Sequence, residues 1–194
     1  MINFRYVKFK NFLSTGNILT EIQLDRSPNT LVIGENGAGK STMLDALCFA
    51  LFGKPFRKIK KSQLINSVNM KDAFVEVEFG IGSINYKIIR CLKPNKFEIY
   101  VDGQLLDQTA SVRDYQEYLE KNILKLNFTS FTQIVILGSS TFVPFMQLPA
   151  NQRREIIEDL LDIKIFTAMN ILLKEKVQSN KENILEIKYK IDLE

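Results

Sequence analysis

Hydrophobic and polar residues alternate with a period of two over four segments, residues 2–9, 74–79, 83–90 and 97–101. This period is typical of β-strands that bury one face, and residues 20–24 could pair with the first segment as another strand. The last three segments follow one another closely along the chain. We therefore expect them to form an antiparallel β-meander within a larger α/β framework.

Turn residues separate the expected strands. Residues 93–95 (Lys-Pro-Asn) lie between the third and fourth segments, and Asp102-Gly103 follows the fourth. An Asp-Gly pair favours the tight two-residue turns that join antiparallel strands. The sequence thus predicts a hairpin at Asp102-Gly103, with a short return strand after it.

Two short runs are apolar without alternation, residues 30–33 and residues 133–138. Continuous apolar runs of this length are typical of strands buried on both faces, as in the interior of a mixed or parallel sheet. The first run ends at Gly34, which opens a glycine-rich turn. We expect both runs to be buried strands of an α/β domain with a mixed sheet.

Helical periodicity appears in residues 40–52, in residues 111–124, and again in residues 150–163 after Pro149. Apolar residues in the first helix follow the i, i+3, i+4, i+7 spacing, and Gly53 then closes it. Ser111 with an aspartate three residues later resembles a capping pair. The chain therefore changes from strands to helices in its last third.

A heptad pattern can be laid on the chain from Phe166 onward, and its eight core positions include six apolar residues. This pattern predicts the start of a coiled coil, although an ordinary amphipathic surface helix gives a similar pattern. We divide the chain into a head lobe at residues 1–163 and a coiled-coil root at residues 164–194. The pattern reaches Glu194 without a capping signal, so we expect a longer helix.

The amino-acid composition excludes several classes of protein and of functional site. The chain has 194 residues, of which 45% are hydrophobic and 25% charged, enough for a substantial core. Histidine is absent, which excludes histidine-based triads and His-ligated zinc. Cys48 and Cys91 lack metal-like spacing and are expected to be buried thiols in a reducing compartment. No run is long enough to span a bilayer and the N-terminus is no secretory signal, so we expect a cytoplasmic protein without membrane contact.

Residues 34–41 (Gly-Glu-Asn-Gly-Ala-Gly-Lys-Ser) fit the phosphate-loop pattern G-x-x-x-x-G-K-[ST]. Its glycines let successive backbone N–H groups point toward phosphate oxygens, and Lys40 supplies a charge near the β- and γ-phosphates. Ser41 offers a hydroxyl to Mg²⁺. An apolar run before the loop and a helix after it complete the expected context. The sequence therefore predicts nucleoside triphosphate binding, with Lys40 as the catalytic residue.

A complete P-loop hydrolase needs an acidic residue at the end of a second apolar strand to hold Mg²⁺, and no convincing one is evident. Asp102 follows an apolar strand but is better explained by the hairpin turn, and Asp159 lies on an expected helix. The guanine-reading N-K-x-D sequence of GTPases is also absent. We expect no ATP hydrolysis by this chain alone. An unrelated P-loop kinase or NTPase would instead require a hidden acidic ligand.

The phosphate loop and the following Thr42-Met43-Leu44-Asp45 resemble the SMC-like branch of the ABC-type ATPases. Residues 10–14 (Lys-Asn-Phe-Leu-Ser) resemble the K-N-F-x-S segment that opens those proteins. Residues 131–160 are similar to SbcC-type DNA repair ATPases. Several short sequence segments, such as Gly-Lys-Pro-Phe at 53–56, most resemble the large subunits of bacteriophage recombination endonucleases. The resemblance covers essentially the whole chain and corresponds to an N-terminal half.

This resemblance implies a particular assembly. The chain would continue into a coiled coil and return as a C-terminal half that carries the signature motif and the acidic metal ligand. Two heads would sandwich two ATP molecules and control an SbcD-type nuclease at double-stranded DNA ends, in a bacterial or phage-infected host cytoplasm. The alternative within the branch is an SMC-type DNA clamp without a nuclease.

The resemblance also implies site residues. Ser139 aligns with the Q-loop glutamine as a second metal ligand, although Gln133 is the nearest glutamine, and Leu13 replaces an arginine that contacts ATP in many relatives. Residues 65–67 align with a segment near the adenine. The expected ATP-contacting residues are Asn11, Ser14, Gly34, Asn36, Gly37, Ala38, Gly39, Lys40, Ser41, Thr42, Ile65, Asn66 and Ser67.

Five cations lie within residues 54–61, namely Lys54, Arg57, Lys58, Lys60 and Lys61. Such a cluster can contact the phosphate backbone of DNA, with binding that is independent of sequence and steeply dependent on salt. A solvated loop beside the nucleotide explains the same residues. With a net charge of +4, the chain permits nucleic-acid contact without requiring it.

Overall fold

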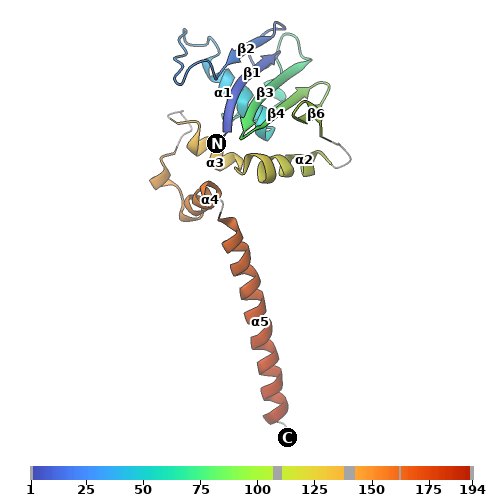
Figure 1. The fold of residues 1–194 in the computed structure, drawn as a ribbon, viewed down its shortest axis with the longest axis vertical. Coiled ribbons are helices and arrows are strands. Elements are labelled where there is room, and N and C mark those ends of the chain that lie inside the picture. The colour runs from blue at the N-terminus through green and yellow to red at the C-terminus, as the bar shows by residue number, and fades with distance from the viewer. Residues whose placement is uncertain (1, 107–110, 138–142, 162, 193–194) are drawn as a thin grey trace. The chain divides into compact units, whose positions relative to one another are not determined.

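The computed structural model describes residues 2–106, 111–137, 143–161 and 163–192 (Figure 1). The chain divides into two compact units, residues 1–143 and residues 144–194. The first unit holds the sheet and the helices packed on it, and the second holds the last two α-helices. The expected division at residue 163 stays a prediction.

The elements alternate strands and helices in the first unit and are helical in the second. In chain order they are β1 (Ile2–Lys10), β2 (Thr20–Gln23), α1 (Lys40–Phe52), η1 (Lys61–Leu64), β3 (Ala73–Ile81), β4 (Ile84–Leu92), β5 (Lys96–Val101), β6 (Gln104–Leu105), α2 (Val112–Tyr118), η2 (Leu119–Leu124), α3 (Phe128–Ile134), η3 (Phe145–Gln147), α4 (Ala150–Leu160) and α5 (Lys164–Asp192). The expected α/β fold ending in a long helix is confirmed. The expected mixed sheet is wrong for the described residues, because all paired strands are antiparallel and the two apolar runs expected inside the sheet do not join it.

The six strands form one sheet in the order β2-β1-β3-β4-β5-β6, and every neighbouring pair is antiparallel. The expected meander is confirmed as β3, β4 and β5 (Figure 1). Asp102 and Gly103 both have positive φ, 48° and 83°, as a type I′ turn requires. The pair therefore makes the predicted hairpin between β5 and β6.

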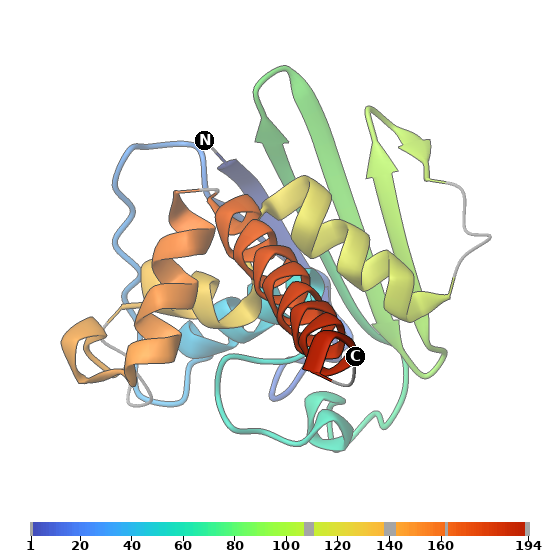
Figure 2. The ribbon, with the colours of Figure 1, turned by 90° about the horizontal axis from the view of Figure 1, so that it is seen from below.

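Helix α1 packs against β1, β3 and β4 on one face of this sheet (Figure 2). The last seven residues of α1, 46–52, are all buried, and they meet the inward side chains of the sheet, such as Val7, Val77 and Ile88. Helix α3 packs against the end of α1, where the ring centres of Phe131 and Phe52 lie 5.1 Å apart. The core thus fixes the helix that begins at the phosphate loop.

A buried arginine secures the C-terminal end of α1. Arg90 is 8% exposed, its Nε donates to the carbonyl of Ala50 at 3.0 Å, and its guanidinium stacks 3.6 Å from the centre of the Phe97 ring. Burial lowers the pKa of Arg90 to about 9. Gln116 of α2 donates to the carbonyl of Leu51, so two side chains satisfy carbonyls that the helix end leaves open.

The predicted strand at residues 30–33 is not a strand, and neither are the described residues of the one predicted at 133–138, of which Gly138 lies outside the described residues. Residues 30–33 have no regular secondary structure and are exposed, with Leu31 82% and Ile33 83% exposed. Residues 133 and 134 end α3, and Leu137 is 64% exposed. An apolar strand of this kind forms only between two neighbouring strands. Within the described residues the sheet offers none beside these segments.

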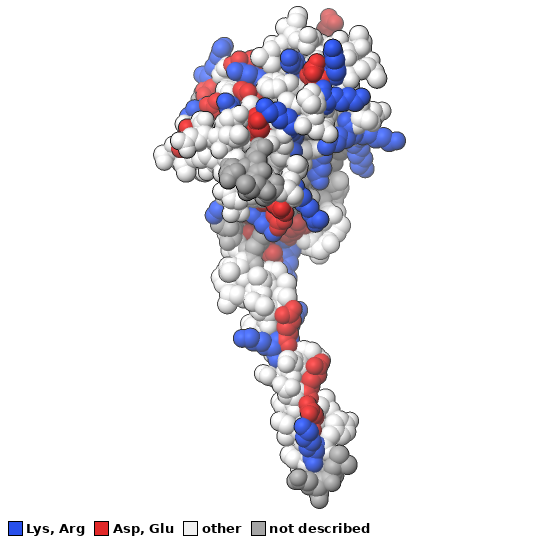
Figure 3. All heavy atoms as spheres, turned by 90° about the vertical axis from the view of Figure 1, so that its right-hand side faces the viewer, with Lys and Arg blue, Asp and Glu red and all other residues white. Residues whose placement is uncertain are grey.

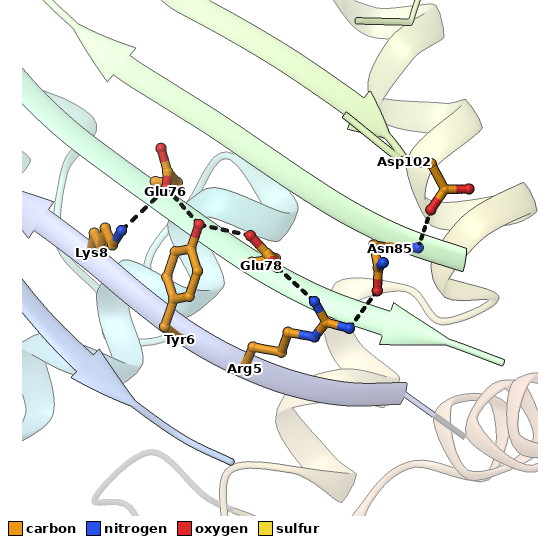
Figure 4. A network of polar contacts seen from close by, with 7 residues as sticks. All are labelled: Arg5, Tyr6, Lys8, Glu76, Glu78, Asn85 and Asp102. Atoms are coloured by element: carbon orange, nitrogen blue, oxygen red, sulfur yellow. Dashed lines mark hydrogen bonds and ion pairs between the residues drawn. The ribbon is translucent and has the colours of Figure 1, made fainter. Parts of the chain in front are cut away.

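The outer face of the sheet carries a polar network (Figure 4). The Tyr6 hydroxyl lies 2.8 Å from both the Glu76 and the Glu78 carboxylates, and Arg5 pairs with Glu78 at 2.9 Å. Burial and these two carboxylates raise the pKa of Tyr6. Asn85 continues the network by accepting a bond from Arg5. The alternation of β1 and β3 thus puts apolar residues inward and paired charges outward.

The second unit contains α4 and the long α5, as the sequence predicts. Within this unit Ile156 of α4 is buried, but Ile157 is 42% exposed. The apolar residues of α5 are half or more exposed along its length, among them Leu173, Ile184 and Ile187. Figure 3 shows this uncharged surface between scattered acidic and basic side chains. No described helix is both long enough and apolar enough to cross a membrane.

Candidate nucleotide-binding site

The phosphate loop precedes the N-terminus of α1. Gly37 and Gly39 have φ values of 91° and 93°, in a region that side chains disfavour. The Ala38 N–H donates to Glu35 and the Thr42 N–H to Gly39, which curls the loop into the first turn of α1. The positive end of α1 and its open N–H groups therefore face the loop, an arrangement suited to an anion.

A cavity of about 580 Å³ opens beside this loop, a volume in the range typical of small-molecule sites. One group of lining residues is polar and basic and comes from the loop and α1. Another group carries apolar side chains and hydroxyls from the segments after β1 and around η1. The lining consists of Leu13, Ser14, Asn36, Gly37, Gly39, Lys40, Ser41, Thr42, Arg57, Ile59, Gln63, Ile65 and Ser67.

Lys40 folds its ammonium group back over the loop. Its Nζ donates to the carbonyls of Gly34 and Glu35, at 2.5 and 2.6 Å. A bound phosphate offers the same group a charged acceptor, whereas the two carbonyls are neutral, so the phosphate adds an ion pair to the hydrogen bond. The side chain is therefore placed to exchange loop carbonyls for phosphate oxygens.

Nine of the expected site residues meet in this cavity, and the others lie elsewhere. Gly34 and Ala38 belong to the loop but do not line the cavity, while Asn11 and Asn66 are buried behind its wall, at 2% and 7% exposure. Ser139 lies outside the described residues. The residues that do line it are Ser14, Asn36, Gly37, Gly39, Lys40, Ser41, Thr42, Ile65 and Ser67.

Arg57 is a site residue that the sequence interpretation missed, because it was counted only with the basic cluster. It lines the cavity, and its guanidinium pairs with Asp45, a fully buried carboxylate on α1. The Arg57 backbone N–H also donates to Asp45 at 3.2 Å. Asp45 lies five residues after Lys40, on the same helix. The position of Asp45 on the helix that follows the phosphate loop could have indicated an acidic partner for a nearby cation.

The remaining cations of residues 54–61 are exposed. Lys54 lies 4.1 Å from the centre of the Phe128 ring, whereas Lys58, Lys60 and Lys61 extend from the surface. Only Arg57 of the five reaches the cavity lining. The four lysines therefore remain available for a polyanion.

No cluster of three or more histidine, cysteine or acidic side chains suited to a metal occurs among the described residues. Among the described residues, the cavity lining contains no carboxylate. Ser41 supplies a hard oxygen donor, which fits a Mg²⁺ that keeps several waters and phosphate oxygens as its other ligands. Ser41 as a metal ligand stays a prediction.

The family model described as AAA domain matches residues 6–193. The chain belongs to this family. An AAA domain with an intact phosphate loop implies ATP binding. The family therefore supports the expected enzyme class as far as a P-loop ATPase domain.

Individual relatives show which members of the family this chain resembles. It is 46% identical over 172 residues to exonuclease subunit 2 of Escherichia phage RB69, across 89% of this chain and 30% of the relative. The subunit of the same name from Enterobacteria phage T4 is also 46% identical, across 90% and 31%. A DNA double-strand break repair Rad50 ATPase of Thermoplasma acidophilum is 30% identical, across 95% and 20%. The expected relationship to SbcC-type and phage proteins is confirmed, and the chain spans less than a third of these relatives.

Solved structures support the fold. A structure from work on ATP-driven dimerization and DNA-stimulated activation of SMC ATPases matches 81% of this chain and 99% of its own, with a TM-score of 0.55 and 20% identity. The Pyrococcus furiosus Smc head domain with an extended coiled coil, bound to the C-terminal domain of ScpA, matches 97% and 49%, with a TM-score of 0.60 and 20% identity. Both structures come from studies of SMC proteins.

Proposed function

We propose that this chain is the N-terminal, ATP-binding lobe of a Rad50/SbcC-type ATPase that regulates a partner nuclease during double-strand-break processing and recombination. It acts with the C-terminal half of the same ATPase and with a second copy of the head. ATP binding closes the two heads and hydrolysis reopens them. The setting is bacterial or phage-infected cytoplasm, and the substrates of the complex are double-stranded DNA ends.

The observation that carries this proposal is a phosphate-loop cavity without a carboxylate in its described lining. The loop, Lys40 and the start of α1 provide what triphosphate binding needs. The acidic group that holds the metal and polarises water for hydrolysis must come from elsewhere. A split head, with that acid on the C-terminal half, accounts for both features.

The exposed segment at residues 30–33 supports the same assembly. Its apolar side chains and unpaired backbone resemble the edge of an unfinished sheet. A strand from the C-terminal half would pair with it and bury Leu31 and Ile33. The loop would then connect a strand to a helix, as in other P-loop proteins.

Within the cavity, Lys40 would bond the β- and γ-phosphates and Ser41 would hold Mg²⁺, while the loop N–H groups bind the phosphate oxygens. Mg²⁺ bound there would neutralise charge that develops on the phosphates. Arg57, held by Asp45, adds a second positive charge to the cavity lining. The position expected for the Q-loop residue, Ser139 or Gln133, stays a prediction.

The test is ATP turnover by this chain alone and again after addition of the matching C-terminal half and DNA. We expect no turnover alone and DNA-stimulated turnover after complementation. Lys40→Ala should abolish nucleotide binding or turnover in the assembled complex. Turnover by the lone chain would instead indicate an unrelated P-loop NTPase with its own acidic ligand.

A clamp subunit without a nuclease is the second candidate, because both solved structures come from studies of SMC proteins. Purification of the complete ATPase complex separates the two candidates. A co-purifying metallophosphatase-type nuclease supports the repair function, and a complex without one supports the clamp.

We also propose that Lys54, Lys58, Lys60 and Lys61 contact the DNA backbone. Removing two of these lysines should flatten the salt dependence of DNA binding by about two phosphate contacts. An unchanged slope would leave them as a solvated loop.

A further inference from the structure

Two loops contribute four side chains to the cavity lining outside the phosphate loop. Residues 11–17 follow β1 and contribute Leu13 and Ser14 to the lining, and residues 65–72 follow η1 and contribute Ile65 and Ser67. We call these four side chains the nucleoside wall. The loops approach through a bridge between Phe12 and Ile65, with the Leu13 N–H bonded to Leu64 at 2.7 Å.

Asn66 joins the two loops through its side chain. Its Nδ2 donates to the carbonyls of Leu13 and Thr15, at 3.2 and 3.0 Å, which lie on either side of Ser14. Its Oδ1 accepts from the N–H groups of Val68 and Asn69, at 2.9 and 3.0 Å. A carboxamide has two donor hydrogens and two acceptor lone pairs. All four are used within the protein, so Asn66 has none left for a nucleotide.

Asn11 extends the same connection. It lies in the left-handed region, with a φ of 50°, which asparagine tolerates better than most residues. Its Oδ1 accepts from Asn69 at 2.7 Å and its Nδ2 donates to Asn17 at 3.0 Å. Its carbonyl accepts the Asn66 N–H at 2.8 Å. Both loops are therefore tied together behind the wall, on the side away from the cavity lining.

We propose that Asn66 and Asn11 are positioning residues that hold the nucleoside wall in place, rather than the nucleotide contacts that the sequence suggested. This inference rests on the proposed ATP binding. A preformed wall spares the ordering cost of its side chains on binding. The phosphate-loop part of the lining is built separately, by α1 and the loop before it.

The inference is tested with two ligands, ATP and inorganic tripolyphosphate, which shares the phosphates but lacks the nucleoside. The main variant is Asn66→Ser, whose shorter hydroxyl can still accept from the N–H groups two and three residues on but cannot reach Leu13 and Thr15. We expect ATP affinity to fall about tenfold and tripolyphosphate affinity to stay within about twofold.

Asn85→Ala is the matched control, because it removes an asparagine side chain that accepts a bond from Arg5 on the sheet face of the same unit (Figure 4). It should change neither affinity. If Asn66→Ser does not fold, Asn69→Ala removes only the bond to Asn11 and should give a smaller change with the same selectivity. Equal losses for both ligands, or no loss for either, would overturn the positioning role. A wild-type chain that binds neither ligand would overturn the proposed ATP binding itself.

Discussion

The pair between Asp45 and Arg57 allows a quantitative prediction about stability. Asp45 has no exposed side-chain surface, whereas the Arg57 side chain keeps 37% of its surface exposed. Arg57 supplies both its guanidinium and its backbone N–H to this carboxylate. Replacing Arg57 by alanine removes the guanidinium and leaves a buried carboxylate with one backbone bond.

Removing one partner of a buried pair costs about 3–5 kcal/mol, because the other charge is left unpaired. We expect a cost of about 3 kcal/mol for Arg57→Ala, at the lower end, because water already reaches the guanidinium. Asp45→Asn should cost less, since it leaves a cation that solvent can reach. In the double variant the buried charge is gone, so its cost should lie below the sum of the two single costs by about 1–2 kcal/mol.

The assay is urea unfolding of the chain without nucleotide, with the four proteins of the double-mutant cycle compared at equal m-values. Lys58→Ala is the control, because Lys58 is an exposed cation next in sequence, and its free energy of unfolding should change by less than about 0.5 kcal/mol. A loss below about 1 kcal/mol for Arg57→Ala would refute the reasoning, since that is the value of an ordinary surface pair.

Three further outcomes follow from the packing. Leu31→Asp should leave the stability of the lone chain within about 0.5 kcal/mol but weaken association with the C-terminal half, as measured by titration calorimetry. Gly53→Ala should cost about 1–2 kcal/mol in urea unfolding, because φ is 70° and the added Cβ would lie 3.3 Å from Arg90. Burial raises the pKa of Cys48 from 9.0 to about 12. Between these two pH values the thiol of the unfolded chain loses its proton while the thiol of the native protein keeps it. The free energy of unfolding should therefore fall between pH 9 and 12, and Cys48→Ala should reduce that fall.

The parts of the fold that the sequence predicted correctly are those whose neighbours lie in the same chain. The alternation in β3 and β4 and the turn at Asp102-Gly103 led to the right meander, because antiparallel strands pair with their sequence neighbours. Helix α1 was also predicted, and Gly53 closes it as expected, in the left-handed conformation. Local signals were sufficient for each of these elements.

The errors occurred where burial depends on distant partners. The apolar composition of residues 30–33 predicts an interior strand, but composition cannot show that both neighbours are missing from the described sheet. The expected contact between Asn66 and the nucleotide stays a prediction, since a motif gives the position of a residue and not the direction of its side chain. Arg57 was missed because its partner Asp45 is twelve residues away, on another element.

The exposure of residues 30–33 also has a thermodynamic consequence. This segment runs directly into the loop that ends at Lys40, so pairing it into a sheet and binding phosphates would restrict the same stretch of backbone. The event that happens first lowers the conformational entropy of this backbone. The second event then loses less entropy and is more favourable. Such coupling is reciprocal. ATP would tighten the union of the two halves by the same factor by which that union tightens ATP, without any contact between the nucleotide and the joining strand.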